Sequence, residues 1–115
     1  MIFIIEDDFT FASCLKKYCG KKETKIFSNI IDAINEIDEN FPDLIFLDIL
    51  LTGPDGFTLL NELASYPDTS KIPIVIVSSI NFEGKDLSIY GVVDTFNKET
   101  LTPKEIEKYV KRYSY

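Results

Sequence analysis

Acidic side chains follow two apolar runs of the sequence at the point where each run ends. Glu6, Asp7 and Asp8 directly follow the apolar amino-terminal run, and Asp48 directly follows the run Leu44–Leu47. Carboxylates that converge repel one another, and Mg2+ removes that cost because it is a hard cation that prefers oxygen ligands. The acidic triplet on its own slightly favours a plainer interpretation, in which the acids begin a helix whose amino terminus suits negative charge. Taken together with Asp48, it favours a metal site.

A hydroxyl group and an ammonium group follow two further apolar runs. Ser78 comes at the end of residues 72–77, and Lys98 comes shortly after residues 92–96. A serine after a strand is often only a helix cap, and a loop lysine is often only solvated. If both reach the edge of the sheet that carries the acids, the lysine would offset the charge of a phosphoryl group and the hydroxyl would donate to it. Asp48 is then the candidate nucleophile, because a carboxylate is ionised at neutral pH and needs no general base.

The elements that would position these residues alternate between apolar and amphipathic patterns. Nearly continuous apolar runs are typical of parallel strands that helices cover on both faces. The expected strands are residues 1–5, 24–27, 44–47, 72–77 and 92–96. Helical spacing predicts five helices, of which the one at about 82–90 has the fewest apolar positions and the last opens with a capping box, Thr102 to Glu105. This order predicts a doubly wound α/β domain with its site at the carboxyl ends of the strands.

Composition excludes several classes of function. The 115 residues are expected to form a single domain, 1–115, and the net charge of −7 argues against nucleic acid or an anionic membrane as a partner. The chain contains no histidine, so every mechanism that needs a histidine of its own is excluded. No apolar stretch or leader suggests a membrane or export, and we expect a cytoplasmic protein. Cys14 and Cys19 are expected to be buried, reduced thiols.

These motifs together resemble those of response-regulator receiver domains, the CheY-like family, over the whole chain. The resemblance rests on five segments in order: IIEDD at 4–8, PDLIFLDI at 42–49, GPDGF at 53–57, IPIVIVSS at 72–79 and GVVDTFNK at 91–98. It implies a flavodoxin-like sheet of five parallel strands in the order 2-1-3-4-5, flanked by five helices. It also implies a stand-alone switch, monomeric or weakly dimeric, that takes phosphate from a histidine kinase or phosphotransfer protein and signals to a downstream protein of unknown identity.

The resemblance assigns roles residue by residue. Asp48 would carry the phosphoryl group, and Ser78 and Lys98 would bind its oxygens. The Mg2+ ion would be held by Glu6, Asp7, Asp48 and the backbone carbonyl of Leu50. Asp8 falls outside the family's acidic pair and is expected either to start the first helix or to support the metal-binding acids without binding the ion itself.

The segment after Ser78 departs from the family pattern. Thr95 stands where the family usually has a Tyr or Phe that reports phosphorylation, and Phe96 would point to the other side of its strand. Glu99 replaces the usual Pro after the lysine, and the interval between Ser78 and Lys98 is shorter than usual. Any conformational change is therefore expected in residues 79–85.

Two functions other than a phosphorylated switch are conceivable for such a chain. The departures allow a receiver-fold interaction scaffold that works without phosphorylation. A phosphatase of the haloacid-dehalogenase type would need a second Asp two residues after Asp48, and Leu50 stands there.

Overall fold

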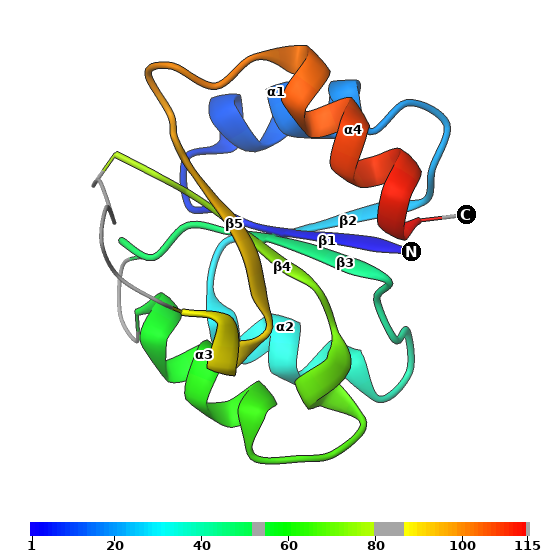
Figure 1. Cartoon of the computed structure of the whole chain (residues 1–115), viewed down its shortest axis with the longest axis vertical. Helices are drawn as coiled ribbons and strands as arrows, with labels where there is room; N and C mark the ends of the chain where they lie inside the picture. The colour runs from blue at the N-terminus through cyan, green and yellow to red at the C-terminus, as the bar shows by residue number, and fades with distance from the viewer. Residues whose placement is uncertain (52–54, 80–86, 115) are drawn as a thin grey trace.

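The computed structural model describes residues 1–51, 55–79 and 87–114 and shows a parallel sheet with helices on both faces (Figure 1). The sheet has five strands in the order β2-β1-β3-β4-β5, which confirms the predicted fold and strand order. The elements in chain order are β1 (Ile2–Ile5), α1 (Phe9–Tyr18), β2 (Thr24–Phe27), α2 (Ile30–Ile37), β3 (Leu44–Leu47), α3 (Gly56–Ala64), η1 (Thr69–Lys71), β4 (Ile74–Ser78), η2 (Ser88–Tyr90), β5 (Val92–Asn97) and α4 (Pro103–Tyr113), where η denotes a short 3-10 helix.

The described residues form four of the five predicted α-helices. The remaining helix, expected at about 82–90, lies mostly outside the described residues, and its described end is the 3-10 turn η2. Most of the segment 79–85, where a conformational change was expected, also lies outside them. The carboxyl-terminal helix is therefore α4 in Figure 1.

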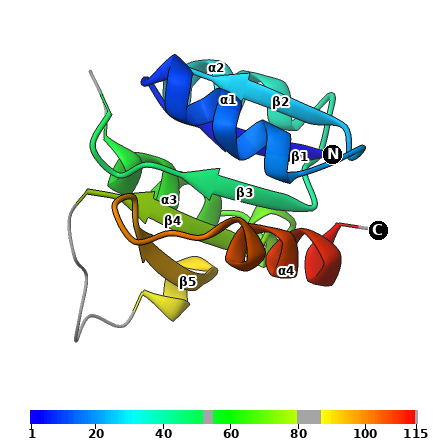
Figure 2. The same ribbon diagram turned by 90° about the horizontal axis from the view of Figure 1, so that it is seen from above.

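Strands β1, β3 and β4 are buried along their whole length because helices cover both faces of the sheet. Helices α2 and α3 lie on one face, and α1 and α4 lie on the other, as Figures 1 and 2 show. Alternate residues of each strand feed two separate cores: Phe3 and Ile5 pack toward α2 and α3, whereas Ile2 and Ile4 pack toward α1 and α4. The continuous apolar runs in the sequence thus reflect two cores that share one sheet.

Side-chain caps begin helices α1 and α4. Asp8 is the N-cap of α1, and its side chain accepts a hydrogen bond from the backbone N–H of Phe11. The predicted capping box of α4 is present: the Thr102 side chain accepts from the Glu105 N–H, and the Glu105 side chain accepts from the Thr102 N–H. Each cap satisfies backbone donors that the first helical turn leaves unpaired.

Successive residues of the edge strand β5 face opposite sides of the sheet. Thr95 pairs with Ile76, a residue of the core beneath α2 and α3. Phe96 packs in the opposite core, with its ring centroid 5.7 Å from that of Tyr109 on α4. The expectation that Phe96 points away from the Thr95 side is confirmed. On the α4 side of β5, the Tyr109 hydroxyl also donates a hydrogen bond to Asp94.

The cysteine prediction was half wrong. Cys19 is buried, but Cys14 is exposed, and both thiols are free. The buried stripe of α1 runs through Ala12 and Leu15 toward Cys19, at helical spacing, and Cys14 lies off it. Among the described residues, no helix combines the length and apolar character needed to cross a membrane.

Candidate functional site

The acidic residues meet at the carboxyl edge of the sheet because the strand pairing continues into them. Ile5 of β1 pairs with Leu47 of β3, and the N–H of Asp48 donates to the Ile5 carbonyl at 3.0 Å. The N–H of Glu6 donates to the carbonyl of Phe27 on β2 at 2.9 Å. The neighbouring strands β1 and β3 therefore end side by side, each followed by a carboxylate. Glu6, Asp7 and Asp48 offer oxygens that all lie within 4.8 Å of one another.

Asp48 is buried, with 5% of its surface exposed, and each of its two carboxylate oxygens contacts a donor group. Its Oδ1 accepts a hydrogen bond from the backbone N–H of Leu50 at 3.0 Å. Its Oδ2 lies 3.1 Å from the Lys98 ammonium. Together the two contacts fix the orientation of the Asp48 carboxylate.

Lys98 pairs with two buried carboxylates at once. Its ammonium forms ion pairs with both Glu6 and Asp48. The backbone N–H of Lys98 donates to the carbonyl of Ser78 at 3.0 Å, which anchors the end of β5 to the end of β4. The lysine thus reaches the acids because β4 lies next to β3 and β5 lies next to β4.

The charges at this edge shift one another's ionisation. Burial raises the pKa of Glu6 to about 7, the hydrogen bond from Lys98 opposes the rise, and the neighbouring Asp48 adds to it. Burial acts to lower the pKa of Lys98, but its hydrogen bonds and charge interactions with Glu6 and Asp48 outweigh burial and leave that pKa raised. The Lys98 ammonium is therefore charged at neutral pH, and it faces more negative charge than it can balance.

The donor set fits a hard divalent cation. Three carboxylates lie close together, only two of them pair with the ammonium, and all their donor atoms are oxygens, the ligands Mg2+ prefers. Glu6 Oε1 is buried and ion-paired with Lys98, but among the described residues no hydrogen bond of ordinary geometry reaches it. An acidic triad of this kind is typical of the receiver metal site, and it is consistent with a phospho-aspartate site.

The other predicted site residues take the following places. Ser78 is fully buried at the end of β4. Leu50 contacts Asp48 through its backbone N–H. A Ser78 hydroxyl bond to a phosphoryl oxygen and a metal bond from the Leu50 carbonyl stay predictions. Asp8 starts α1, as expected, and its backbone N–H also donates to Glu6 Oε2 at 3.3 Å.

The sequence did not predict the pairing of Lys98 with Glu6. It led us to expect that Asp8 could support the acids, but not that it would do so through a backbone hydrogen bond to Glu6. The first contact depends on strand order, and the only signal for the second was the adjacency of the acids.

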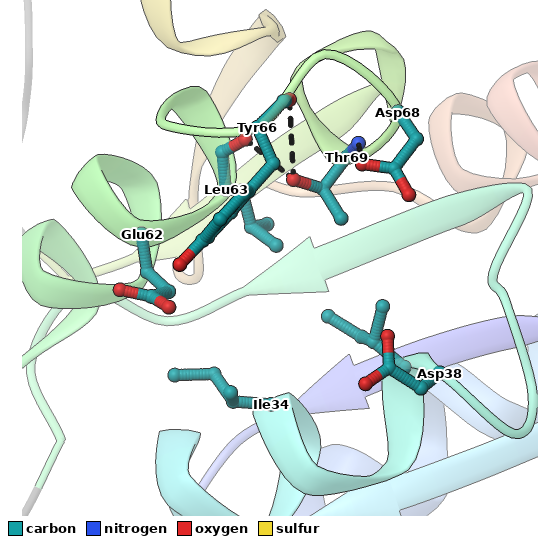
Figure 3. A pocket seen from close by; sticks show the side chains of 8 residues that line it. Ile34, Asp38, Glu62, Leu63, Tyr66, Asp68 and Thr69 are labelled. Carbon is teal, nitrogen blue, oxygen red and sulfur yellow. Dashed lines mark hydrogen bonds between the residues drawn. The ribbon is translucent and has the colours of Figure 1, made fainter.

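A cavity of about 350 Å³ lies between α2, α3 and η1, away from the acidic edge (Figure 3). Ile37 and Leu63 lie in its apolar part, and Asp38 and Glu62 bring carboxylates to it. It is lined by the carboxyl-terminal halves of α2 and α3, which run back toward the amino ends of the parallel strands. The cavity is thus separate from the carboxyl edge that holds Asp48.

Comparison with known proteins agrees with this geometry. The family model described as "Response regulator receiver domain" matches residues 2–111. The "Transcriptional regulatory protein MalR" of Bacillus subtilis is 30% identical over 112 residues, which are 94% of this chain and 46% of that protein. The "Transcriptional regulatory protein BaeR" of Escherichia coli is 29% identical over 96% of this chain and 46% of its own length. The chain therefore spans about half the length of these curated relatives.

Solved structures give the same result. A putative response regulator from Chloroflexus aurantiacus superposes with a TM-score of 0.84 at 28% identity, covering 97% of this chain and 94% of that one. A signal receiver domain from Colwellia psychrerythraea gives a TM-score of 0.84 at 28% identity, covering 96% and 94%. The sheet order, the acidic triad beside Lys98 and these matches lead to one conclusion: the chain belongs to the response regulator receiver domains of two-component signal transduction, which are phosphoacceptor switches rather than catalytic enzymes.

Proposed function

We propose that Asp48 accepts a phosphoryl group from a phosphohistidine of a histidine kinase or phosphotransfer protein, with Mg2+ bound beside it. The observation that carries this proposal is the placement of Asp48, a buried carboxylate at the end of β3 that faces both Lys98 and two further carboxylates. A receiver domain implies a histidine kinase as partner. The donor must supply the histidine, since this chain has none.

The transfer exchanges one bond for another. An oxygen of Asp48 attacks the phosphorus, the P–N bond to the donor's imidazole breaks, and an acyl phosphate forms on Asp48. The Lys98 ammonium offsets the negative charge of the phosphoryl oxygens, and the Ser78 hydroxyl donates to one of them. The Leu50 N–H keeps the carboxylate oriented.

The proposed Mg2+ ligands are the carboxylates of Glu6, Asp7 and Asp48 and the backbone carbonyl of Leu50. When bound, the ion would neutralise charge between these carboxylates and the phosphoryl oxygens. Glu6 and Asp7 would then keep the ion at the edge of the sheet while Asp48 reacts.

The test is incubation of the chain with a small phosphodonor and Mg2+, followed by intact-mass measurement. We expect an acid-stable, alkali-labile adduct that maps to Asp48 and is lost in Asp48→Asn. Asp43→Asn is the matched control, because Asp43 lies just before the opposite end of the same strand and pairs with the amino terminus. An adduct that persists in Asp48→Asn, or no adduct on the wild type, would refute the proposal.

A second candidate is an interaction scaffold that does not depend on phosphorylation. It is favoured by Thr95 in the usual aromatic position and by the packing of the partly buried Phe96 against Tyr109 on the other side of the sheet. Affinity for a purified partner that is unchanged by beryllofluoride with Mg2+ and by Asp48→Asn would support it. A marked change in affinity would support the phosphorylated switch instead.

The output would be a contact with a downstream protein in the cytoplasm. MalR and BaeR are named as transcriptional regulators, and the matched region is less than half of each. We propose that this domain signals its phosphorylation state through contacts with another protein, as a monomer or a weak dimer.

A further inference from the structure

The aromatic ring of Phe11 lies against the ammonium of Lys98. The Lys98 Nζ is 4.8 Å from the centroid of that ring, within the range of a cation–π contact. Phe11 is half-buried on α1, and its backbone N–H donates to the N-cap residue Asp8 at 3.2 Å. The helix cap therefore fixes the start of α1, and α1 brings the ring to the lysine.

The ring differs from the other two partners of Lys98 in one physical respect. Glu6 and Asp48 attract the ammonium through negative charge, and both are proposed Mg2+ ligands. A divalent cation bound to these carboxylates weakens their attraction for the ammonium, and it also repels the ammonium directly. The ring attracts a cation through its quadrupole and does not bind Mg2+, so its attraction persists when the ion is bound.

We propose that Phe11 is a positioning residue, whose ring keeps the Lys98 ammonium turned toward Asp48 while a divalent cation occupies the acidic edge. The alternative is that Phe11 only fills space in the core beneath α1 and α4, against which it packs. The consequence for phosphoryl uptake rests on the proposed function, whereas the contact between ring and ammonium does not. The two experiments below separate these parts.

The first experiment measures the rate of phosphoryl uptake from a small phosphodonor at saturating Mg2+. Phe11→Leu keeps an apolar side chain but removes the ring, and we expect uptake to slow roughly two- to fivefold, as the loss of a partly exposed cation–π contact implies. Phe11→Tyr keeps the ring and should restore the wild-type rate. Phe57→Leu is the matched control, since Phe57 is a partly buried phenylalanine packed on the other face of the sheet.

A double-mutant cycle distinguishes positioning from packing. In a Lys98→Gln background, Phe11→Leu should slow uptake no further, because the cation on which the ring acts is gone. Equal rates for Phe11→Leu and Phe11→Tyr would overturn the proposal. So would an undiminished effect of Phe11→Leu in the Lys98→Gln background.

The second experiment does not depend on phosphorylation. The Lys98 Cε protons, assigned with Lys98→Gln, should show an upfield ring-current shift that persists when Mg2+ is added. Phe11→Tyr should keep the shift, and Phe11→Leu should lose it. A wild-type shift that matches Phe11→Leu, with or without Mg2+, would overturn the proposal even if Asp48 is phosphorylated. A persistent shift in a chain that takes up no phosphate would leave the contact standing and refute only the proposed function.

Discussion

Replacing Lys98 with Met should destabilise the fold, and the loss should depend on pH. The ammonium lies 3.1 Å from Asp48 and also pairs with Glu6. At an effective dielectric constant of about 20, the Lys98–Asp48 attraction alone amounts to about 5 kcal/mol. Removing the cation also removes its own desolvation cost, so the net loss at pH 8 without divalent ions should be about 3–5 kcal/mol, the range for breaking a buried ion pair.

Glu6 supplies the pH dependence. Burial already raises the pKa of Glu6 to about 7 from its ordinary value of 4.5, and losing Lys98 removes the partner that lowers it. A carboxyl whose pKa is raised by folding binds a proton more readily in the folded chain. Its contribution to stability is therefore complete below about pH 4.5 and is lost as the pH rises through the folded pKa. The deficit of Lys98→Met should be smaller at pH 6, where Glu6 can be neutral, than at pH 8.

The assay is urea unfolding followed by circular dichroism at pH 6 and pH 8, with divalent ions chelated. Lys104→Met is the control, because Lys104 is exposed on the first turn of α4 and should change the free energy of unfolding by no more than about 0.5 kcal/mol. A deficit of equal size at both pH values would refute the role of Glu6. A deficit no larger than that of the control at pH 8 would refute the ion-pair reasoning itself.

Four further predictions concern Mg2+ binding, Gly56 and the two cysteines. Mg2+ at 100 times its dissociation constant should raise the free energy of unfolding of the wild type by about 2.7 kcal/mol, and should raise the free energy of unfolding of Asp48→Ala much less. Equal gains for the two proteins in urea titrations would contradict the metal site. Gly56→Ala should destabilise by about 1–3 kcal/mol in urea, since a Cβ there would lie 2.8 Å from Ile49 Cα; a neutral result would show that the backbone can move. Burial raises the pKa of the Cys19 thiol to about 11. The wild type should therefore lose stability relative to Cys19→Ala as the pH rises from about 9 to about 11. Free energies of unfolding that vary with pH in the same way for both proteins would contradict this. A thiol reagent should modify Cys14 in the folded chain before it modifies Cys19.

The sheet could be predicted because its strands are buried on both faces. Strands β2 and β3 begin and end where the apolar runs predicted. Strand β4 begins at Ile74, two residues later than predicted, although Ile72 is also buried. The N–H of Ile72 donates to Thr69 within the turn η1, so this residue enters the core from a turn. Burial alone does not show whether an apolar residue lies in a strand.

The grouping of the acids could be predicted from the sequence, but the pairing of Lys98 with them could not. The acids and Lys98 each follow a strand, which the sequence shows directly. The pairing of Lys98 with Glu6 requires β1, β3, β4 and β5 to be adjacent in that order, which depends on how the sheet is assembled. The exposure of Cys14 was missed because a small thiol is compatible with either side of an amphipathic helix.

The hydrogen bond between Tyr109 and Asp94 ties edge strand β5 to helix α4. The Phe96 ring also packs on Tyr109, so two alternate residues on the α4 side of the strand, Asp94 and Phe96, contact the same side chain. A rotation or slide of β5 that starts at Lys98 would have to break both contacts or carry α4 with it. Tyr109 thus links the strand to the helix, and a displacement of β5 would reach the solvent-facing side of α4 through this one side chain.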